Sequence, residues 1–412
     1  MAQDWRPTSW LVGAVVAGIT GLALAVLLRR PDLLILSFVP AGVALWSLVT
    51  RPAVTPEIDP AGTSPTTATG QQSVWSLHGR HLGQAEQWWT QCAPISGIRW
   101  EQDILGGYTH TAAARLEGRW TAERIGAASV GAAVTELISP WAAYRVGPIR
   151  IPATEVRVRP RPSPIGSQLQ LPHPIGLVGV NRSTSRGSGS EFADVRAYRP
   201  GDRLRAIHWP RTARTGQLHV RDNYAEQDAA VLVVVDGSGG GQSWQRGLQA
   251  AATVAEFFIR HGDRVALVVL GAGRPAYLPY GAGQRHYHRI ADVLSTAREP
   301  AASEPPRQVR LPVQAGCTVF VVSSVLTQVA PAVAVGLAQR GLPVIVLDTV
   351  PDAGGIAEPV DQLTMRLRLL ERRRVIDRLT QAGAQVTAWD GPGSLELPMR
   401  RLVRRPPLRV RA

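Results

Sequence analysis

Residues 179–238 read GVNRSTSRGSGSEFADVRAYRPGDRLRAIHWPRTARTGQLHVRDNYAEQDAAVLVVVDGS, and their last part decides the fold of the second half of the chain. The segment ends in the uninterrupted apolar run 230–235, which stops at Asp236. An apolar strand without polar alternation is typical of a strand that is buried on both faces. The run therefore predicts the first strand of a sheet that is covered by helices on both sides.

Downstream of this strand, short apolar runs alternate with segments of helical spacing, which predicts an α/β domain with a mainly parallel sheet over 230–398. The expected strands are 230–235, 265–270, 318–322, 344–347 and 385–389, and the expected helices are 243–261, 284–298, 329–340 and 361–382. Ligands of such sheets bind at the carboxyl ends of the strands, and Asp236 lies at such an end.

The N-terminal region contains two uncharged apolar runs, 10–28 and 33–49, separated by the charged turn 29–32. At ~1.5 Å per residue, each run is about long enough to cross the hydrocarbon core of a bilayer. Trp5, Trp10 and Trp46 lie near the ends of these runs, where an interfacial aromatic side chain is favourable. We predict a transmembrane hairpin over 1–50 in the cell membrane. The nearly balanced arginines do not determine which side carries the soluble part.

The remaining segments are assigned from composition and periodicity. Residues 51–70 are rich in Pro, Thr and Gly and predict a linker, and 71–161 contain short strand-like runs that predict a small β-sandwich-like domain. A basic tail occupies 399–412.

The net charge of +14 favours attraction to anionic lipid over nucleic-acid binding, because the basic residues are dispersed and lack interleaved stacking aromatics. The distant Cys92 and Cys317 predict buried free thiols, with a bridge between domains as the alternative if the chain faces an oxidising compartment.

The segment 175–229 carries a dense pattern of glycine, arginine, acidic and aromatic residues. Its members are Gly187, Gly189, Glu191, Phe192, Val195, Arg196, Tyr198, Gly201, Asp202, Arg205, Ile207, Trp209, Ala213, Arg214 and Leu218. This pattern resembles the signature of the domain-of-unknown-function-58 family (DUF58), in which a Leu is usual at position 195 and an Asp at position 208. The segment 277–286 also resembles that family, so the likeness covers nearly the whole chain.

The resemblance implies an N-terminal membrane hairpin, a middle β domain and a C-terminal von Willebrand factor A-like domain. It also implies a partner, because genes of this family commonly lie beside genes for MoxR-type AAA+ ATPases. The family has no established catalytic activity, so we expect a non-enzymatic adaptor with a cytoplasmic soluble part. Two alternatives stay open, namely an envelope-facing binding protein with the soluble part outside and, less favoured, a hydrolase.

A von Willebrand A-like domain can bind Mg²⁺ through D-x-S-x-S after its first strand together with oxygens from later strand ends. Asp236 and Ser238 fit that motif, but position 240 is Gly, and Ser323-Ser324 stand where an Asp would be expected. Hard cations need several oxygen ligands. We therefore expect a degenerate partner-binding site without a cofactor, with Mg²⁺ as the alternative. In a third interpretation, Asp236 and Ser238 cap the following helix.

The signature segment also offers candidate partner-binding residues, namely Glu191, Arg196, Asp202, Arg205, Trp209 and Arg214. Arginines form bidentate pairs with carboxylates and stack on aromatic faces, so the segment is expected to form a rigid charged platform. Two functions remain open for these residues. They either contact the ATPase, or they form ion pairs that only hold the segment together. Membrane lipid and other membrane proteins are further expected partners.

Overall fold

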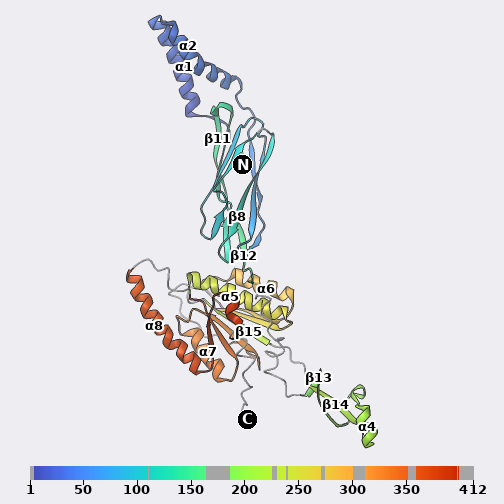
Figure 1. Cartoon of the computed structure of the whole chain (residues 1–412). Coiled ribbons are helices and arrows are strands. Elements are labelled where there is room, and N and C mark those ends of the chain that lie inside the picture. The colour runs from blue at the N-terminus through green and yellow to red at the C-terminus, as the bar shows by residue number, and fades with distance from the viewer. Residues whose placement is uncertain are drawn as a thin grey trace. The chain divides into compact units, whose positions relative to one another are not determined.

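The computed structural model describes residues 4–109, 111–163, 186–224, 230–237, 240–270, 274–299, 311–314, 316–350, 359–396 and 398. The chain separates into two compact units, Met1–Arg159 and Pro160–Ala412 (Figure 1). The predicted basic tail, 399–412, lies outside the described residues.

The N-terminal region forms two antiparallel helices, α1 (Ser9–Leu28) and α2 (Pro31–Val49). Both are long and apolar enough to cross a membrane, with mean hydropathies of 2.5 and 1.9. Thr8 caps α1, since its hydroxyl accepts a hydrogen bond from the Leu11 N–H. Arg29 ends α1 in the left-handed region at φ 50°, and Pro31 begins α2 at the position where a helix tolerates proline. The predicted pair of apolar helices is confirmed within one or two residues at each end.

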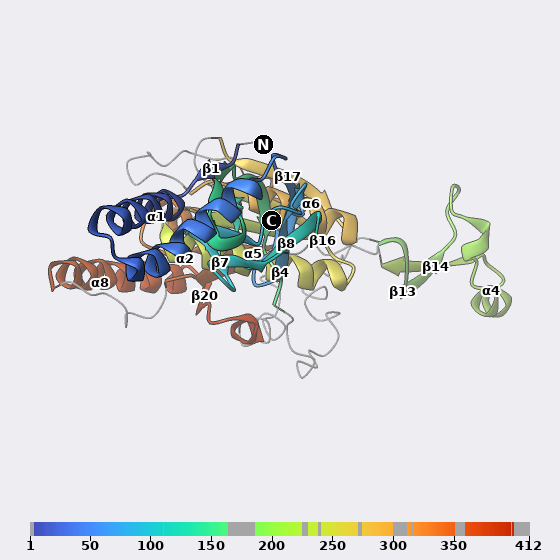
Figure 2. The same ribbon diagram turned by 90° about the horizontal axis from the view of Figure 1, so that it is seen from above.

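The two helices lie side by side because small residues line their contact (Figure 2). A Cβ atom added at Gly21 would lie 2.7 Å from the Cβ of Ser37, and one added at Gly18 would lie 3.0 Å from Ala41. Most large apolar side chains point outward, among them Val26, which is 72% exposed. Small residues at the contact and apolar residues outside are the arrangement expected of helices that associate within lipid.

The rest of the first unit consists of β-strands in three sheets, with the orders β1-β11-β10-β5-β7, β2-β4-β8-β6 and β3-β12-β9. The strand bounds are β1 Arg6–Pro7, β2 Glu57–Gly62, β3 Thr66–Ala68, β4 Gln72–Arg80, β5 Gln87–Cys92, β6 Ile98–Trp100, β7 Ile104–Tyr108, β8 Ala113–Ala122, β9 Gly126–Val130, β10 Ala133–Ile138, β11 Tyr144–Ile151 and β12 Thr154–Arg159. A short 3₁₀ turn, η1 (Pro140–Ala142), joins β10 to β11.

The strands share one hydrophobic core, and along strands such as β8 and β10 buried side chains alternate with more exposed ones. Its largest members are tryptophans from different strands, and Trp75 and Trp120 are each 1% exposed. The ring of Trp75 meets that of Trp100 edge to face, with centroids 5.7 Å apart. The predicted β-rich character of 71–161 is confirmed, and both predicted free thiols are found as buried free cysteines.

The range 51–70, predicted to be a linker, contains the strands β2 and β3 and needs correction. Both strands lie at the edges of their sheets. Proline is tolerated at a sheet edge, where its missing N–H removes no ladder hydrogen bond. Pro60 lies within β2, whose backbone is paired with β4. The proline content of this range therefore resembles that of a linker although the range contains strands.

The second unit contains a six-stranded sheet with the order β17-β16-β15-β18-β19-β20. The strands are β15 Ala230–Asp236, β16 Arg264–Leu270, β17 Ala276–Gly281, β18 Thr318–Ser323, β19 Val344–Asp348 and β20 Gln385–Ala388. The helices are α5 Gly241–Arg260, α6 Gln284–Thr296, α7 Val329–Gln339 and α8 Pro359–Gln381, and a 3₁₀ turn, η4, spans Pro392–Leu395. All pairings are parallel except that of β16 with the edge strand β17.

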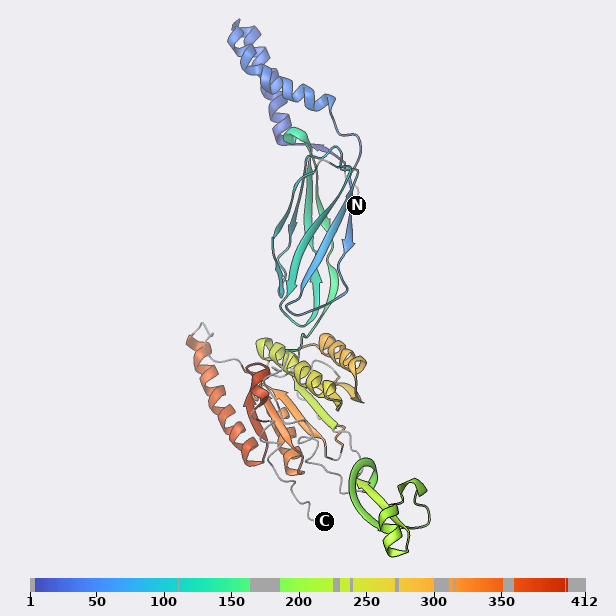
Figure 3. The same ribbon diagram turned by 45° about the vertical axis from the view of Figure 1, so that its right-hand side comes forward.

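Helices cover both faces of this sheet, with α5 and α6 on one face and α7 and α8 on the other (Figure 3). Leu232 and Val234 pack with residues of α7 and α8. Val235 faces Gly247 of α5 instead, because a Cβ at Gly247 would lie 3.9 Å from the Val235 side chain. Residues 231–235 are each at most 1% exposed, which confirms the predicted strand that is buried on both faces.

Besides β2 and β3, further described strands are not predicted from the sequence pattern. Strand β17 contains Pro279 and lies antiparallel at the sheet edge, where proline is tolerated, so its sequence does not have the pattern of a central strand. Strand β13 (Arg186–Ala197) pairs with β14 (His219–Tyr224) in an antiparallel hairpin. The first residues of β13 belong to the Arg/Ser/Gly-rich run of the signature, which has low strand propensity.

We expect Gly21→Val to separate α1 from α2, because the new side chain would overlap Ser37. Overpacking of this kind costs about 1–3 kcal/mol. Thermal unfolding in detergent micelles should show a lower midpoint for this variant. Gly13→Val is the matched control, since a Cβ at Gly13 meets nothing within 4 Å. Equal midpoints for the two variants would contradict the small-residue contact.

Candidate functional site

Three polar side chains meet at the carboxyl ends of neighbouring parallel strands. Asp236 ends β15, Ser323 ends β18 and Asp348 ends β19, and they are 7%, 1% and 3% exposed. The Ser323 hydroxyl donates to Asp236 Oδ2 at 2.7 Å and accepts a hydrogen bond from the Val325 N–H at 3.0 Å. Ser323 therefore uses both its donor and an acceptor position within the protein.

Asp348 is paired with a cation from the helical layer. The guanidinium of Arg372 on α8 contacts Asp348 Oδ2, and the Val350 N–H donates to Oδ1 at 3.2 Å. Burial lowers the pKa of the Arg372 guanidinium, although arginine stays protonated in proteins, so the contact is ionic. Because both side chains are largely buried, loss of either partner would leave an uncompensated charge.

The first turn of α5 begins beside this edge of the sheet. Its N-cap residue is Gly240, which has φ 60° and no side chain to accept a hydrogen bond. The Gly241 N–H donates to Glu299 Oε1 at 2.5 Å, so an acidic residue that follows α6 lies at the positive end of the helix dipole. Capping of this helix by Asp236 stays a prediction, and Ser238 lies outside the described residues.

The described strand-end residues offer few free oxygen ligands for Mg²⁺. Asp236 already accepts from Ser323, and Asp348 is neutralised by Arg372, whose positive charge opposes a nearby cation. No group of three or more His, Cys, Asp or Glu that could hold a metal ion occurs among the described residues. A hard divalent cation needs about six oxygen ligands, of which Asp236 would supply only one or two.

The signature segment forms the hairpin β13–β14, which is closed by the 3₁₀ turn η3 (Leu204–Ala206) and the short helix α4 (Trp209–Thr215). Pro210 lies in the first turn of α4, and Gly216 ends the helix at φ 71°. His208 caps α4, since its Nδ1 accepts from the Arg211 N–H at 3.2 Å. The imidazole thus supplies the acceptor that an Asp would provide at this position.

Arg196 joins two acidic residues of the hairpin. Its guanidinium forms a bidentate pair with Asp202, at 2.7 Å for each of the two bonds, and its Nε donates to Asp222 Oδ2 at 3.0 Å. Hydrogen bonds from Arg196 and from the Arg199 N–H lower the pKa of Asp202 to about 2. Hydrogen bonds to Asp202 and Asp222 raise the pKa of Arg196. These bonds fix the turn 198–202 against β14, as expected for a structural ion pair.

The other candidates are exposed. Trp209 on α4 is 66% exposed, and Leu204 on η3 is 69% exposed. Arg205 and Arg214 are also exposed, and neither has an ion-pair partner in the part of the chain that the structure describes. We call these four residues the η3–α4 surface. It combines an aromatic ring, an aliphatic side chain and two unpaired guanidinium groups.

The structure therefore divides the predicted partner-binding residues into two groups. Arg196 and Asp202 bond to each other, whereas Arg205, Trp209 and Arg214 point to solvent. The side chain of Glu191 lies outside the described residues. Sequence reasoning missed Asp222 as the third member of the ion cluster, although the alternation of Arg221 and Asp222 along β14 could have indicated it. The described cation–π contact joins Arg221 to Phe192 at 5.6 Å, not an arginine to Trp209.

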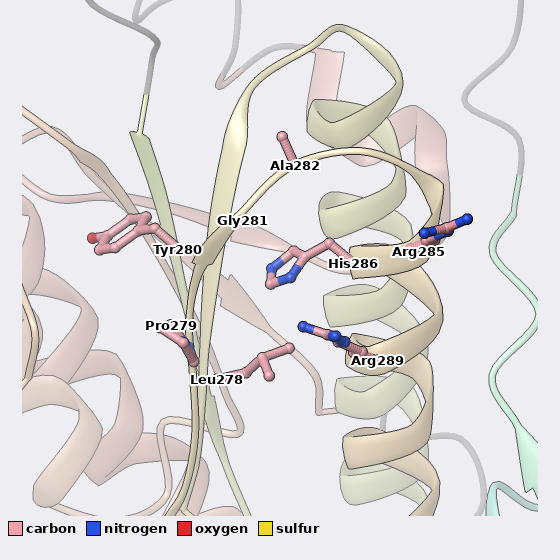
Figure 4. A pocket seen from close by; sticks show the side chains of 8 residues that line it. All are labelled: Leu278, Pro279, Tyr280, Gly281, Ala282, Arg285, His286 and Arg289. Carbon is pink, nitrogen blue, oxygen red and sulfur yellow. The ribbon is translucent and has the colours of Figure 1, made fainter.

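A cavity of about 260 Å³ lies between β17 and α6 (Figure 4). The side chains of His286 and Arg289 point toward β17, whereas Arg285 points away from it. His286 is buried, and its Nε2 lies 2.8 Å from the Val265 carbonyl oxygen. None of the lining residues is acidic, so this cavity lacks the paired acid and base that hydrolysis commonly uses.

The fold and these contacts define an α/β protein with an arginine-rich β-hairpin before its central strand. Residues 194–350 match the model of the family described as "Protein of unknown function DUF58". The resemblance to this family is confirmed over that range.

Curated relatives include "Uncharacterized protein Rv1480" of Mycobacterium tuberculosis and "Uncharacterized protein Mb1516" of Mycobacterium bovis, each 31% identical over 123 residues. The alignment covers 28% of this chain and 39% of each relative, so the chain spans about two fifths of the length of the curated relatives it matches.

We expect Arg372→Met to destabilise the second unit by about 3–5 kcal/mol, because it leaves the Asp348 carboxylate buried without a cation. Arg374→Met is the control, since Arg374 is exposed on the same helix. Urea unfolding of both variants measures the difference. A loss for Arg372→Met no larger than that for Arg374→Met would show that the ion pair does not hold α8 to the sheet.

The pKa of the Asp202 carboxyl should be about 2, below its ordinary value of 3.8, and Arg196→Gln should raise it toward 3.8. Because the folded-state pKa is the lower one, the pair stabilises the hairpin above pH 3.8, and this contribution disappears as the pH falls through about 2. Carboxyl ¹³C NMR titration measures the midpoint. Arg205→Gln should leave it unchanged, and an unchanged midpoint in Arg196→Gln would refute the assignment.

Proposed function

We propose that this chain is a membrane-anchored, non-enzymatic adaptor whose soluble part engages a MoxR-type AAA+ ATPase. The observation that carries the proposal is the η3–α4 surface. Exposed tryptophan and arginine side chains are typical of the few residues that dominate protein–protein binding energy. In the described structure, Arg205 and Arg214 are available to acidic groups of a partner because neither pairs within the chain.

The ion cluster of Arg196 supports the same proposal. It holds the turn 198–202 and β14 together through short bidentate bonds, so the adjacent residues are presented on a fixed backbone. Binding to a pre-organised surface costs less conformational entropy than binding to a mobile one. Arg196 and Asp202 are therefore proposed to position the η3–α4 surface and not to contact the partner.

We further propose that the second unit is a von Willebrand factor A-like domain. Counted along the chain, its strand order is 3-2-1-4-5-6, with an antiparallel edge strand. Ligand sites of such sheets lie at the carboxyl ends of the strands. The pairing of Ser323 with Asp236 and of Arg372 with Asp348 supports a site that has lost its metal and keeps the shape of a strand-end surface.

The proposed location is the cell membrane, with α1 and α2 crossing it and the soluble part in the cytoplasm. The length and hydropathy of both helices support the crossing. A reporter that is active only in the cytoplasm, fused after Ala412, tests the orientation. Activity is the expected result, whereas an inactive cytoplasmic reporter together with an active export-dependent one would support the envelope-facing alternative.

Co-purification with the ATPase, with and without ATP, tests the adaptor role. We expect Trp209→Ala and Arg214→Glu each to weaken binding by about tenfold or more, because truncation of a central anchor costs about 2 kcal/mol. Thermal stability should be unchanged, since both side chains are exposed. Arg374→Glu, an exposed charge reversal on α8, is the control. Undiminished binding by both surface variants would overturn the proposal.

A further inference from the structure

The base of the helical hairpin is fixed to the β-rich part of the first unit. Strand β1 ends one residue before the α1 cap and pairs with β11, with Pro7 opposite Tyr144. Thr8 continues this connection, since its N–H donates to the Ala143 carbonyl oxygen at 3.0 Å and its hydroxyl donates to that of Ala142 at 2.7 Å. The first residue of α1 therefore directly follows a paired backbone.

The chain leaving α2 is fixed at the same end. The indole Nε1 of Trp5 donates to the Val54 carbonyl oxygen at 2.9 Å, which joins the segment before α1 to the segment after α2. The amide oxygen of Gln84 accepts from the N–H groups of Ala53 and Val54, at 2.9 and 3.0 Å. The position of this end of the β-rich part is thus set by the helices.

The turn η1 lies at this junction, and its backbone is unusual. Trp141 and Ala142 both have positive φ, 60° and 50°, a region that residues other than glycine seldom occupy. Neighbouring Ala143 is buried, whereas the Trp141 side chain is 60% exposed. The turn therefore holds the Trp141 indole in an exposed position near the start of α1 and the end of α2.

Two further exposed indoles lie at the same end of the hairpin. Trp10 is the second residue of α1 and is 49% exposed, and Trp46 lies within the last turn of α2 and is 60% exposed. Because the helices are antiparallel, the start of α1 and the end of α2 are neighbours. Indoles are favoured at the boundary between lipid headgroups and hydrocarbon, where the ring is in an apolar medium and the N–H stays near water.

We propose that η1 is an interfacial membrane anchor, with the Trp141 indole inserted at the headgroup boundary of the bilayer that α1 and α2 cross. This inference rests on the proposed membrane location. The partner is phospholipid, because the exposed ring is held at the base of helices whose outward residues are themselves suited to lipid. The β-rich part would then contact the membrane surface through a side chain that the sequence pattern of the two spans does not include.

Site-specific labelling of the full chain tests the proposal. Cys92 and Cys317 are buried, and burial raises the pKa of both thiols, that of Cys92 to about 11, so an introduced exposed cysteine is labelled selectively. Trp141→Cys, labelled with the fluorophore NBD, is reconstituted into phosphatidylcholine vesicles that carry a doxyl quencher near the headgroup or deep in the acyl chain. Ala142→Cys is a second variant in case Trp141→Cys does not fold.

Two labels serve as references. Val39→Cys, 68% exposed near the middle of α2, reports whether the hairpin is inserted. Val74→Cys, 43% exposed on β4, reports a site away from the membrane. It lies six residues along β4 from Arg80, whose partner Glu57 follows α2, a separation of roughly 20 Å along the strand.

The expected result is a blue shift and loss of NBD emission at position 141 with the shallow quencher, quenching at position 39 with the deep quencher, and no quenching at position 74. Quenching at 39 without quenching at 141 would overturn the anchor while leaving the proposed membrane location intact. Absence of quenching at both 39 and 141 would overturn both. Equal quenching at 74 and 141 would also overturn the anchor, because contact would then not be specific to η1.

Discussion

The burial of β15 on both faces is the constraint on which the second unit depends. Five consecutive apolar residues, 231–235, lie between two helical layers, and none of them can be exposed without a large loss of hydrophobic stabilisation. Asp236, the polar residue that follows the run, therefore lies at the carboxyl end of this central strand. Asp236, Ser323 and Asp348 share this situation at the ends of three parallel strands, and each is satisfied within the protein.

The hairpin β13–β14 shows a related division of roles among charged side chains. Arginine and carboxylate groups near the turn are used against one another, so the backbone between them has a defined path. Beyond the turn, Arg205, Trp209 and Arg214 are exposed. Paired and exposed charged side chains thus occur within one short stretch of the chain, and the exposed ones are the more accessible to another molecule.

The sequence predicts the features that depend on long apolar patterns and misses those that depend on specific contacts. The two spans, the buried strand β15 and most of the alternating helices and strands follow from periodicity and are found. The edge strands β2, β3 and β17 are missed because proline and polar residues occur there without interrupting a central ladder. The sequence also does not show that Arg196 is paired and Arg205 is exposed. This difference depends on which arginine lies within reach of a carboxylate after folding.

The connection between β1 and α1 has a mechanical meaning. Only Thr8 separates the last paired residue of the strand from the first residue of the helix, and that threonine is itself bonded to the turn η1. These bonds restrain independent rotation of the helices and the β-rich part at this joint. A force that tilts the β-rich part would therefore also tilt the helix pair, because the connection between them is short and hydrogen-bonded.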